Sequence, residues 1–250
     1  MPKVPCLVVI IAALVAGCSG GSGGAQRSTL LTVRAGPGAG FDPASAIALP
    51  NGTLDLQAAL LGIGRVEIEE NTGEGGGSKG KNDGEGKGGG KGGGKGGEET
   101  EDIVLVGPFS LDISSGSAVL GSVMVFPGTF RQAELTLRVD PLPPMSDDSI
   151  QVTGVWHPGA GGAVPVTLHS QLDTQLEVPI ANGGIIVAAN AVVSIELTFD
   201  LAAIFGNLDL STAVVENGAI LIDATHNVAL LHQFEVNFAS FVDFENEEEH

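Results

Sequence analysis

The sequence predicts a mainly β fold, an antiparallel β-sandwich of the Greek-key type with one short C-terminal helix. Three observations carry this prediction. Short segments rich in Val, Ile, Leu and Thr alternate apolar and polar residues, as strands with one buried face do. Gly, Pro and Asn-Gly pairs separate these segments, as in tight turns between strands. One stretch near the C-terminus instead repeats its large apolar residues at helical spacing.

Residues 1–17 have the layout of an export signal. Lys3 supplies a positive charge, and residues 4–15 form a run of twelve apolar or small residues with one internal cysteine. A membrane-spanning helix needs about 20 apolar residues, so this run is too short to span a bilayer. The run Leu14-Val-Ala-Gly-Cys18 resembles the lipobox of bacterial lipoproteins, although Val15 replaces the commoner leucine. The resemblance implies cleavage before Cys18 and a diacylglyceryl thioether on its sulfur; the alternative is an ordinary secretory signal cut near Ala16.

The segment after the signal is expected to be a tether. Residues 18–28 are rich in Gly and Ser, a composition that behaves as a flexible coil. In such lipoproteins, an aspartate directly after the cysteine resembles a signal for inner-membrane retention. In this chain, Ser19 follows Cys18 instead. The lipobox resemblance therefore implies a lipid anchor in the cell envelope, in the outer membrane if the organism has two membranes. Cleavage would discard Cys6, leaving one cysteine and no internal disulfide, so the hydrophobic fraction of 43% must supply stability through its core.

The domain expected from 29 to 244 contains a series of strands. Phe130 to Val139 shows the clearest alternation, with Ala133, Leu135, Leu137 and Val139 on one face. Gly64 interrupts another alternating segment and predicts a bulge. Asn182-Gly183 and Asn217-Gly218 are turn signals. The expected strands are 30–34, 63–69, 103–106, 109–113, 118–126, 130–139, 150–156, 164–169, 176–180, 185–188, 192–199 and 219–222.

Two segments are expected to be helical. Residues 201–205 form a short helical turn within a long connection. Residues 227–241 form a helix that Asn227 can cap, although Phe234, Val236 and Phe238 also alternate as a strand would. Its large apolar residues at helical spacing are expected in the core, and these are Leu230, Leu231, Phe234, Phe238 and Phe241.

The segment 71–102 is expected to be a long disordered insert at the tip of a hairpin. It has no aliphatic or aromatic residue, so it cannot bury enough apolar surface to offset chain entropy. It holds every lysine of the mature chain and seven acids. One interpretation is that its lysines form a basic finger that binds a polyanion. The other is that the insert is a neutral expansion of a hairpin loop, since lengthening a loop costs little closure entropy. Residues 245–250 form an acidic tail.

The number of structural units stays open. The part of the chain outside the insert fits one all-β domain, and the alternative is two packed lobes, 29–140 and 148–244.

The net charge of the chain constrains its partners. The formal charge is −19, and loss of Lys3 with the signal leaves 10 Lys and Arg against 30 Asp and Glu, or −20. Such a charge argues against nucleic acid as a partner of the folded part.

Three segments carry a family resemblance. They are Ile63-Gly-Arg-Val-Glu-Ile, Gly107-Pro-Phe-Ser-Leu-Asp-Ile and Phe126-Pro-Gly-Thr-Phe-Arg-Gln-Ala-Glu-Leu-Thr-Leu. Their order resembles an uncharacterised domain family of bacterial and archaeal lipoproteins, itself similar to transthyretin-like and carboxypeptidase-regulatory-like sandwiches. The resemblance covers residues 30–199; the insert, and Phe130 where tyrosine is usual, depart from the pattern. It implies a β-sandwich at the cell surface and no catalytic residues.

Catalytic, cofactor and metal motifs are not found in the sequence, so no catalytic, cofactor-binding or metal site is predicted. The glycine-rich run 36–40 lacks a following helix signal for phosphate binding. Trp156 is expected to fill the core and His157 to lie in a solvated turn. Calcium is a minor alternative to a solubility role for the acids, with oxygen ligands on loops. Its candidate ligands are Asp147, Asp148, Asn207 and Asp209.

Three functions remain open from the sequence. The first is a lipid-anchored envelope protein that acts as a non-catalytic binding or structural module for an envelope polymer or protein, with Cys18 as its one functional residue. The second is a passive component of envelope assembly. The third is a hydrolase without a recognisable motif, which would need a pocket that gathers His169 or His157 with an Asp or Glu side chain.

Overall fold

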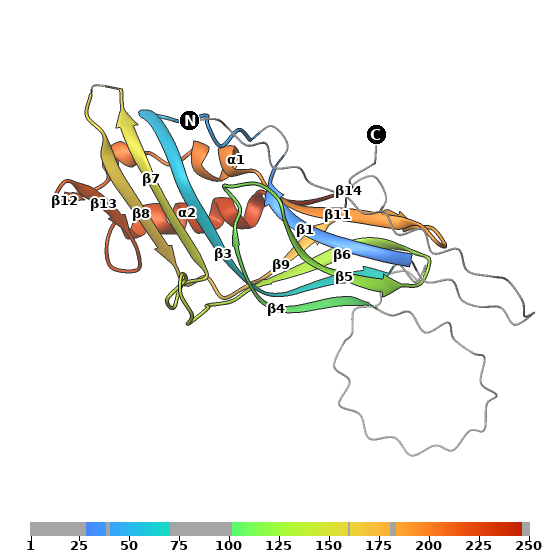
Figure 1. The fold of residues 1–250 in the computed structure, drawn as a ribbon. Helices are drawn as coiled ribbons and strands as arrows, with labels where there is room; N and C mark the ends of the chain where they lie inside the picture. The colour runs from blue at the N-terminus through green and yellow to red at the C-terminus, as the bar shows by residue number, and fades with distance from the viewer. Residues whose placement is uncertain (1–28, 39–40, 71–101, 160, 181–183, 247–250) are drawn as a thin grey trace, which may run out of the picture.

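The computed structural model describes residues 29–38, 41–70, 102–159, 161–180 and 184–246. This part of the chain is mainly β, with 57% of residues in strands that form two sheets (Figure 1). Cys18, the tether 18–28, most of the insert and the end of the acidic tail lie outside the described residues. None of the described helices is long and apolar enough to cross a membrane.

The smaller sheet, sheet A, has four strands in the order β14-β11-β1-β5. β1 pairs in parallel with β11, and the other two pairings are antiparallel. The chain thus brings its first described strand beside one that lies about 160 residues later, Leu30 opposite Val192. Its strands are β1 (Thr29–Pro37), β5 (Ala118–Val125), β11 (Val192–Phe199) and β14 (Val242–Asn246).

The larger sheet, sheet B, follows the order β10-β6-β3-β7-β8-β13-β12, with β2 and β4 also paired to β3 and β9 paired to β6. β8 and β13 are parallel, and the other pairs are antiparallel. The strands are β2 (Ile47–Leu49), β3 (Gly52–Glu70), β4 (Ile103–Asp112), β6 (Gly128–Leu137), β7 (Ile150–Pro158), β8 (Val164–Ser170), β9 (Gln175–Pro179), β10 (Ile185–Val187), β12 (Val215–Glu216) and β13 (Ala219–Ile222).

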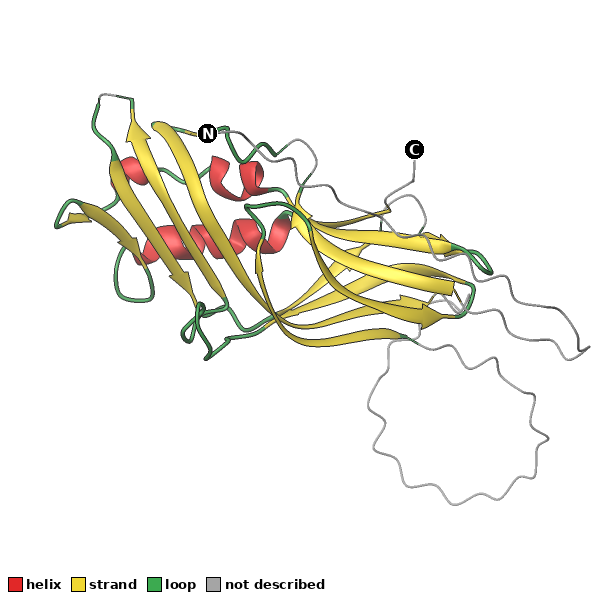
Figure 2. Ribbon diagram, viewed as in Figure 1, coloured by secondary structure: helices red, strands yellow, loops and turns green. Residues whose placement is uncertain are grey.

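The long strand β3 joins two parts of the molecule. Its first half, 52–61, pairs with β7, and its second half, 63–70, pairs with β6. The register shifts between Ile63 and Arg65, so Gly64 marks a bulge where the strand passes from one part to the other. In Figures 1 and 2 the helices lie against only one end of this sheet, and sheet A lies against the other.

The helices cover the end of sheet B that sheet A leaves open. They are α1 (Leu201–Gly206), a 3-10 turn η2 (Leu210–Thr212) and α2 (Val228–Ser240). Phe234 and Phe238 of α2 are each 1% exposed, and their rings pack on Phe205 and Phe199 with centroids 5.4 and 5.6 Å apart. The same core cluster includes Leu31, Leu61, Leu135 and Ile222, so one continuous hydrophobic core runs through both ends.

The predicted fold class is confirmed, with differences in detail. Most predicted strands match within a few residues, the Gly64 bulge is present, and Asn217-Gly218 forms a turn with φ of 51° and 81°. The segments 103–106 and 109–113 belong to one strand, β4, and the first half of β3 was not predicted. Two strand pairs are parallel, whereas a wholly antiparallel sandwich was expected. Asn182-Gly183 lies outside the described residues.

Both expected helices are present, but the prediction that the side chain of Asn227 caps the second helix was wrong. Asn227 occupies the N-cap position of α2 in a left-handed conformation, with φ 51°, but its side chain makes no capping hydrogen bond. β3 and β4 pair antiparallel up to Ile68 and Ile103, so the insert does connect the two strands of a hairpin. Each sheet combines residues from both expected lobes, since β11 pairs with β1; the division into domains stays a prediction.

Candidate ligand-binding groove

A groove opens where the end of β8, the turn between β13 and α2, and the first two turns of α2 meet. Its volume is about 710 Å³, within the range of small-molecule sites. The described residues that line it combine apolar side chains with four carboxylates and two histidines, and none of them is lysine or arginine. The lining residues are Asp148, His169, Gln171, Leu172, Asp173, Asp223, Ala224, Thr225, Val228, Leu231, His232 and Glu235.

The amphipathic spacing of α2 explains how one helix serves both core and groove. Phe234 and Phe238 point into the core, whereas Val228, His232 and Glu235 line the groove. The second set is spaced by four and three residues, so it occupies one face of the helix, adjacent to the buried one. Packing of the phenylalanine face therefore fixes the direction of His232 and Glu235.

The inner wall of the groove holds a histidine–carboxylate pair. His169 Nδ1 lies 2.6 Å from Asp148 Oδ2, and the side chains are 32% and 9% exposed. Asp148 stands in the connection between β6 and β7, where the backbone of Asp140 donates to its carbonyl. His169 is on the solvent-facing side of β8, opposite Gln151 of β7. The pair thus joins the connection to the sheet, and the carboxylate orients the imidazole.

A second polar contact ties the helix to the same wall. Ser170 is fully buried, and its hydroxyl donates to Glu235 Oε1 at 2.7 Å while accepting from the backbone N–H of Leu172 at 3.2 Å. Ser149 donates to the carbonyl of Ser170 at 3.0 Å. Hydrogen bonds of this kind hold the wall of a binding site in place before any ligand arrives.

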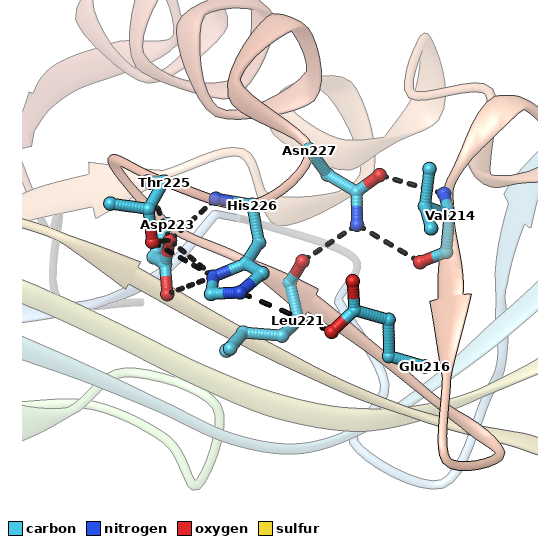
Figure 3. Close-up of polar contacts among 7 residues, drawn as sticks. All are labelled: Val214, Glu216, Leu221, Asp223, Thr225, His226 and Asn227. Atoms are coloured by element: carbon cyan, nitrogen blue, oxygen red, sulfur yellow. Dashed lines mark hydrogen bonds and ion pairs between the residues drawn. The ribbon is translucent and has the colours of Figure 1, made fainter.

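The outer rim is the turn between β13 and α2, drawn in Figure 3. Burial raises the pKa of Asp223, but hydrogen bonds from the backbone and hydroxyl of Thr225 and from His226 outweigh it and hold this pKa well below its usual value. Asn227 donates to the carbonyls of Leu221 and Val214, and its side-chain oxygen accepts from Val214 N–H (Figure 3). These contacts pin the turn to both β13 and the segment before β12.

The second histidine–carboxylate pair has a different setting. His157 Nε2 lies 2.9 Å from Asp55 Oδ2 on the outer face of sheet B, with side-chain exposures of 43% and 55%. Trp156 is buried, as expected, while His157 lies within β7 and not in a turn. His157 and His169, the two histidines considered for a hydrolase, therefore each have a carboxylate partner. Of the two, only His169 lines the groove.

Of the four candidate calcium ligands, only Asp148 is among the described residues that line the groove. Asp147 and Asp148 belong to the β6–β7 connection, whereas Asp209 accepts from Asn51 and Ser211, and Asn207 ends α1. Among the described residues, no group of three or more His, Cys, Asp or Glu side chains is placed to hold a metal ion. In the glycine-rich run 36–40, Gly36 belongs to β1 and Gly38 N–H donates to the carbonyl of Phe199. Calcium binding stays the minor alternative that the sequence left open.

Sequence reasoning did not single out Asp173, Asp223, His232 or Glu235. A signal existed for the helical pair, since His232 and Glu235 stand three residues apart beside the apolar positions of a predicted helix. Nothing in the sequence indicated that Asp148 and His169 would meet. Comparisons with protein-family models, curated proteins and solved structures found no match, so the lipoprotein-family resemblance stays a prediction.

Proposed function

We propose that this protein is an exported cell-envelope protein, anchored by a lipid on Cys18, whose folded part binds a ligand without catalysing a reaction. The N-terminal pattern supports the anchor, because an apolar run too short to span a bilayer ends at Leu14-Val-Ala-Gly-Cys18. The groove supports binding, and it is the observation that carries the proposal: a concavity of about 710 Å³ whose walls are fixed by internal hydrogen bonds.

The charge of the lining selects the ligand chemistry. Asp148, Asp173, Asp223 and Glu235 contribute carboxylates, and none of the described lining residues is lysine or arginine. An anionic ligand would meet like charges with no basic partner, whereas ammonium, guanidinium or hydroxyl groups can donate hydrogen bonds to these oxygens. Leu172, Val228 and Leu231 offer apolar surface beside them. We therefore expect a cationic or hydroxyl-rich ligand, such as an amine-bearing saccharide or a basic peptide.

Calorimetric titration tests this assignment with spermidine, a tetra-arginine peptide and a glucosamine oligomer, and with citrate as the anionic control. At least one of the first three is expected to bind and citrate is not. Asp173→Asn should weaken binding by about 2- to 5-fold, as loss of an exposed charge pair does. Asp55→Asn, an exposed carboxylate outside the groove, should leave binding unchanged. Binding of none of these probes, or of citrate equally well, would count against the groove and favour passive assembly.

The anchor is tested separately by mass spectrometry of the protein made in a bacterial host with a lipoprotein pathway. The expected N-terminal peptide begins at Cys18 and carries the mass of a diacylglyceryl group. A Cys18→Ser variant should keep the signal uncleaved or yield no lipid adduct. An unmodified peptide with an intact Gly17–Cys18 bond would refute the anchor.

A hydrolase is the second candidate, favoured by the His169–Asp148 pair in the groove. With Nδ1 held by the carboxylate, the other ring nitrogen can take a proton from water as the water oxygen attacks an acyl carbon, and return it to the leaving group. Hydrolysis of 4-nitrophenyl butyrate tests this step. His169→Gln should lower the rate about 10²- to 10⁴-fold, whereas His157→Gln should not. A wild-type rate equal to that of buffer would eliminate this candidate.

A further inference from the structure

An apolar row crosses the outer face of sheet A at one end of the sandwich. Leu30 of β1 is in register with Val192 of β11 on one side and with Met124 of β5 on the other. Their exposed fractions are 38%, 70% and 57%. Single exposed apolar residues are common on protein surfaces, but three in register on adjacent strands form a continuous patch.

The apolar surface continues around the end of β5. Met124 and Phe126, which is 41% exposed, line a cavity of about 250 Å³ together with Val104 of β4. Glu70 and Asp102 line the same cavity and are the charged groups among its described lining residues. The row itself carries no charge, so the exposed end of the sandwich is apolar in the middle and acidic at one margin.

The same face becomes polar two residues further along the strands. Thr32 is in register with Ser122 and Ser194, and the hydroxyls of Thr32 and Ser122 lie 2.9 Å apart. The next position places Arg34 opposite Glu196. Apart from the single exposed Val119 opposite Arg34, the apolar surface is therefore confined to the end of the sheet where β1 begins.

That end is where the N-terminal segment enters the fold. Thr29 is the first residue of β1 and the neighbour of Leu30 in the row. Ten residues, 19–28, separate Thr29 from Cys18, and ten residues reach at most about 36 Å even when fully extended. A lipid on Cys18 would hold the row within this distance of the bilayer, which raises its effective concentration at the surface.

We propose that the row Val192–Leu30–Met124, extended by Phe126, rests on the lipid surface to which the chain is anchored. This proposal rests on the lipid anchor of the proposed function. Contact with the bilayer removes the apolar side chains from water, and the ten-residue connection to Cys18 presents this end of the sandwich. The anchored chain, with 10 Lys and Arg against 30 Asp and Glu, has a net charge of −20, which favours a zwitterionic surface over an anionic one. Lipid contact at this end also leaves the groove, on the helical end of sheet B, free to bind its ligand.

Tryptophan quenching by brominated lipid tests the contact. The chain from Cys18 onward retains every described residue and has Cys18 as its sole thiol, which can be coupled to a maleimide lipid in phosphatidylcholine vesicles. Val192→Trp places a reporter in the row. Val119→Trp is the matched control, because Val119 is 60% exposed and in register with Arg34 on the same face, five residues or about 16 Å along β5 from Met124. Buried Trp156 gives both variants the same background.

Brominated lipid is expected to remove at least a third of the added emission of Val192→Trp and under a tenth of that of Val119→Trp. Adding Met124→Asp to the first variant should abolish its quenching. Equal quenching of the two variants, or none at Val192→Trp, would overturn the proposal. A concentration-dependent blue shift of Val192→Trp without vesicles would also overturn it, because a second copy would then cover the row. Chemical coupling supplies the tether whether or not cells lipidate Cys18. The quenching result is therefore independent of the mass-spectrometry test of the lipid anchor.

Discussion

Asp223 fixes the turn that forms the outer rim of the groove. Its Oδ1 accepts from the backbone N–H of Thr225 and of His226, each at 2.7 Å, and from the Thr225 hydroxyl at 2.8 Å. These donors favour the charged carboxylate, which is why its pKa is lowered although burial opposes the shift. A group whose pKa is lower in the folded state stabilises the fold above its unfolded pKa and loses that contribution as the pH falls.

Asp223→Asn should therefore destabilise the protein at pH 7 by about 1 kcal/mol, the usual cost of losing such a turn acceptor. The difference from the wild type should shrink as the pH falls below about 4, where carboxylates of the unfolded chain take up protons. Thermal unfolding between pH 3 and 7 measures this. Glu216→Gln is the control, since Glu216 lies 4.0 Å from His226 but makes none of these turn contacts. A difference that persisted undiminished at pH 3 would contradict the assignment.

Gly52 begins β3 at a place where an added side chain would both strike the neighbouring strand β7 and force a strained backbone. Its φ is +150°, and an added Cβ would lie 2.2 Å from the carbonyl oxygen of His157. Gly116 has a comparable φ of +121° with nothing within 4 Å. Gly116→Ala should cost about 1 kcal/mol from strain alone, and Gly52→Ala about 2–4 kcal/mol because overpacking adds to it. Equal losses in chemical denaturation would show that the contact with β7 is not maintained.

At the scale of elements, α2 shows how a helix separates core from solvent. Phe234 and Phe238 are each 1% exposed and Val236 between them is 53% exposed. A strand would place Phe234, Val236 and Phe238 on one face. Because the two phenylalanines are buried and Val236 is exposed, the burial pattern confirms the helix. The helix contacts β8 and β13, and its phenylalanine face packs on Phe205 of α1 and Phe199 of β11.

Phe234→Ala should destabilise the protein by about 3–5 kcal/mol, the usual cost of removing a buried aromatic ring. Val236→Ala should change the free energy of unfolding by less than about 0.5 kcal/mol, because the side chain is exposed and alanine favours helix. Urea denaturation followed by far-UV circular dichroism measures both. Similar losses for the two variants would mean that α2 packs through a different face.

The sequence predicted elements with a strong local pattern and missed those defined by their neighbours. The alternation of Ala133, Leu135 and Leu137 located β6, and all three are fully buried. The first half of β3 was missed because the register shifts between Leu56 and Ala58. The inward positions change there from Leu54 and Leu56 to Ala59 and Leu61, so the alternation is interrupted. The register of β1 with β11 depends on contacts far apart in sequence, which no local pattern encodes.

The groove illustrates the same limit at the level of side chains. His169 and Asp148 were each considered from the sequence, one for hydrolysis and the other for calcium, but not as a pair. Their meeting depends on β7 and β8 running antiparallel from Ile150 to Ser170, which brings the two ends of that hairpin together. Cys18, in contrast, is defined by a local pattern and needs no fold for its prediction.

At the scale of the whole molecule, β3 makes the two ends of the sheet depend on each other. The strand pairs with β7 at the helical end and with β6 and β4 at the sandwich end, and its hydrogen bonds continue past the bulge at Gly64. Gly62 marks the crossing: its N–H donates to the carbonyl of Ser149, and its carbonyl accepts from Arg138. Because buried residues of both ends belong to one core, we expect a single cooperative unfolding transition.

The insert interrupts this cooperative unit between Glu70, the last residue of β3, and Ile103, the first residue of β4. β3 and β4 are paired from Leu60–Asp112 to Ile68–Ile103, so the hairpin needs only a few residues to close. Replacing 71–101 with four Gly and Ser residues should therefore preserve the fold. Shortening the loop reduces its closure entropy logarithmically, which should raise the free energy of unfolding by about 1–2 kcal/mol. Urea denaturation measures the difference.

A variant that keeps the length of the insert but replaces its five lysines with glycine is the matched control. If the insert is a neutral expansion, this control should unfold like the wild type and the shortened chain should unfold at higher urea. Ligand binding in the groove should be the same in all three, because the groove lies at the helical end of sheet B and the ends of β3 and β4 that flank the insert lie at the other. Loss of stability on shortening, or in the lysine-free control, would instead mean that the insert contacts the acidic folded part, and the basic-finger interpretation would then be favoured.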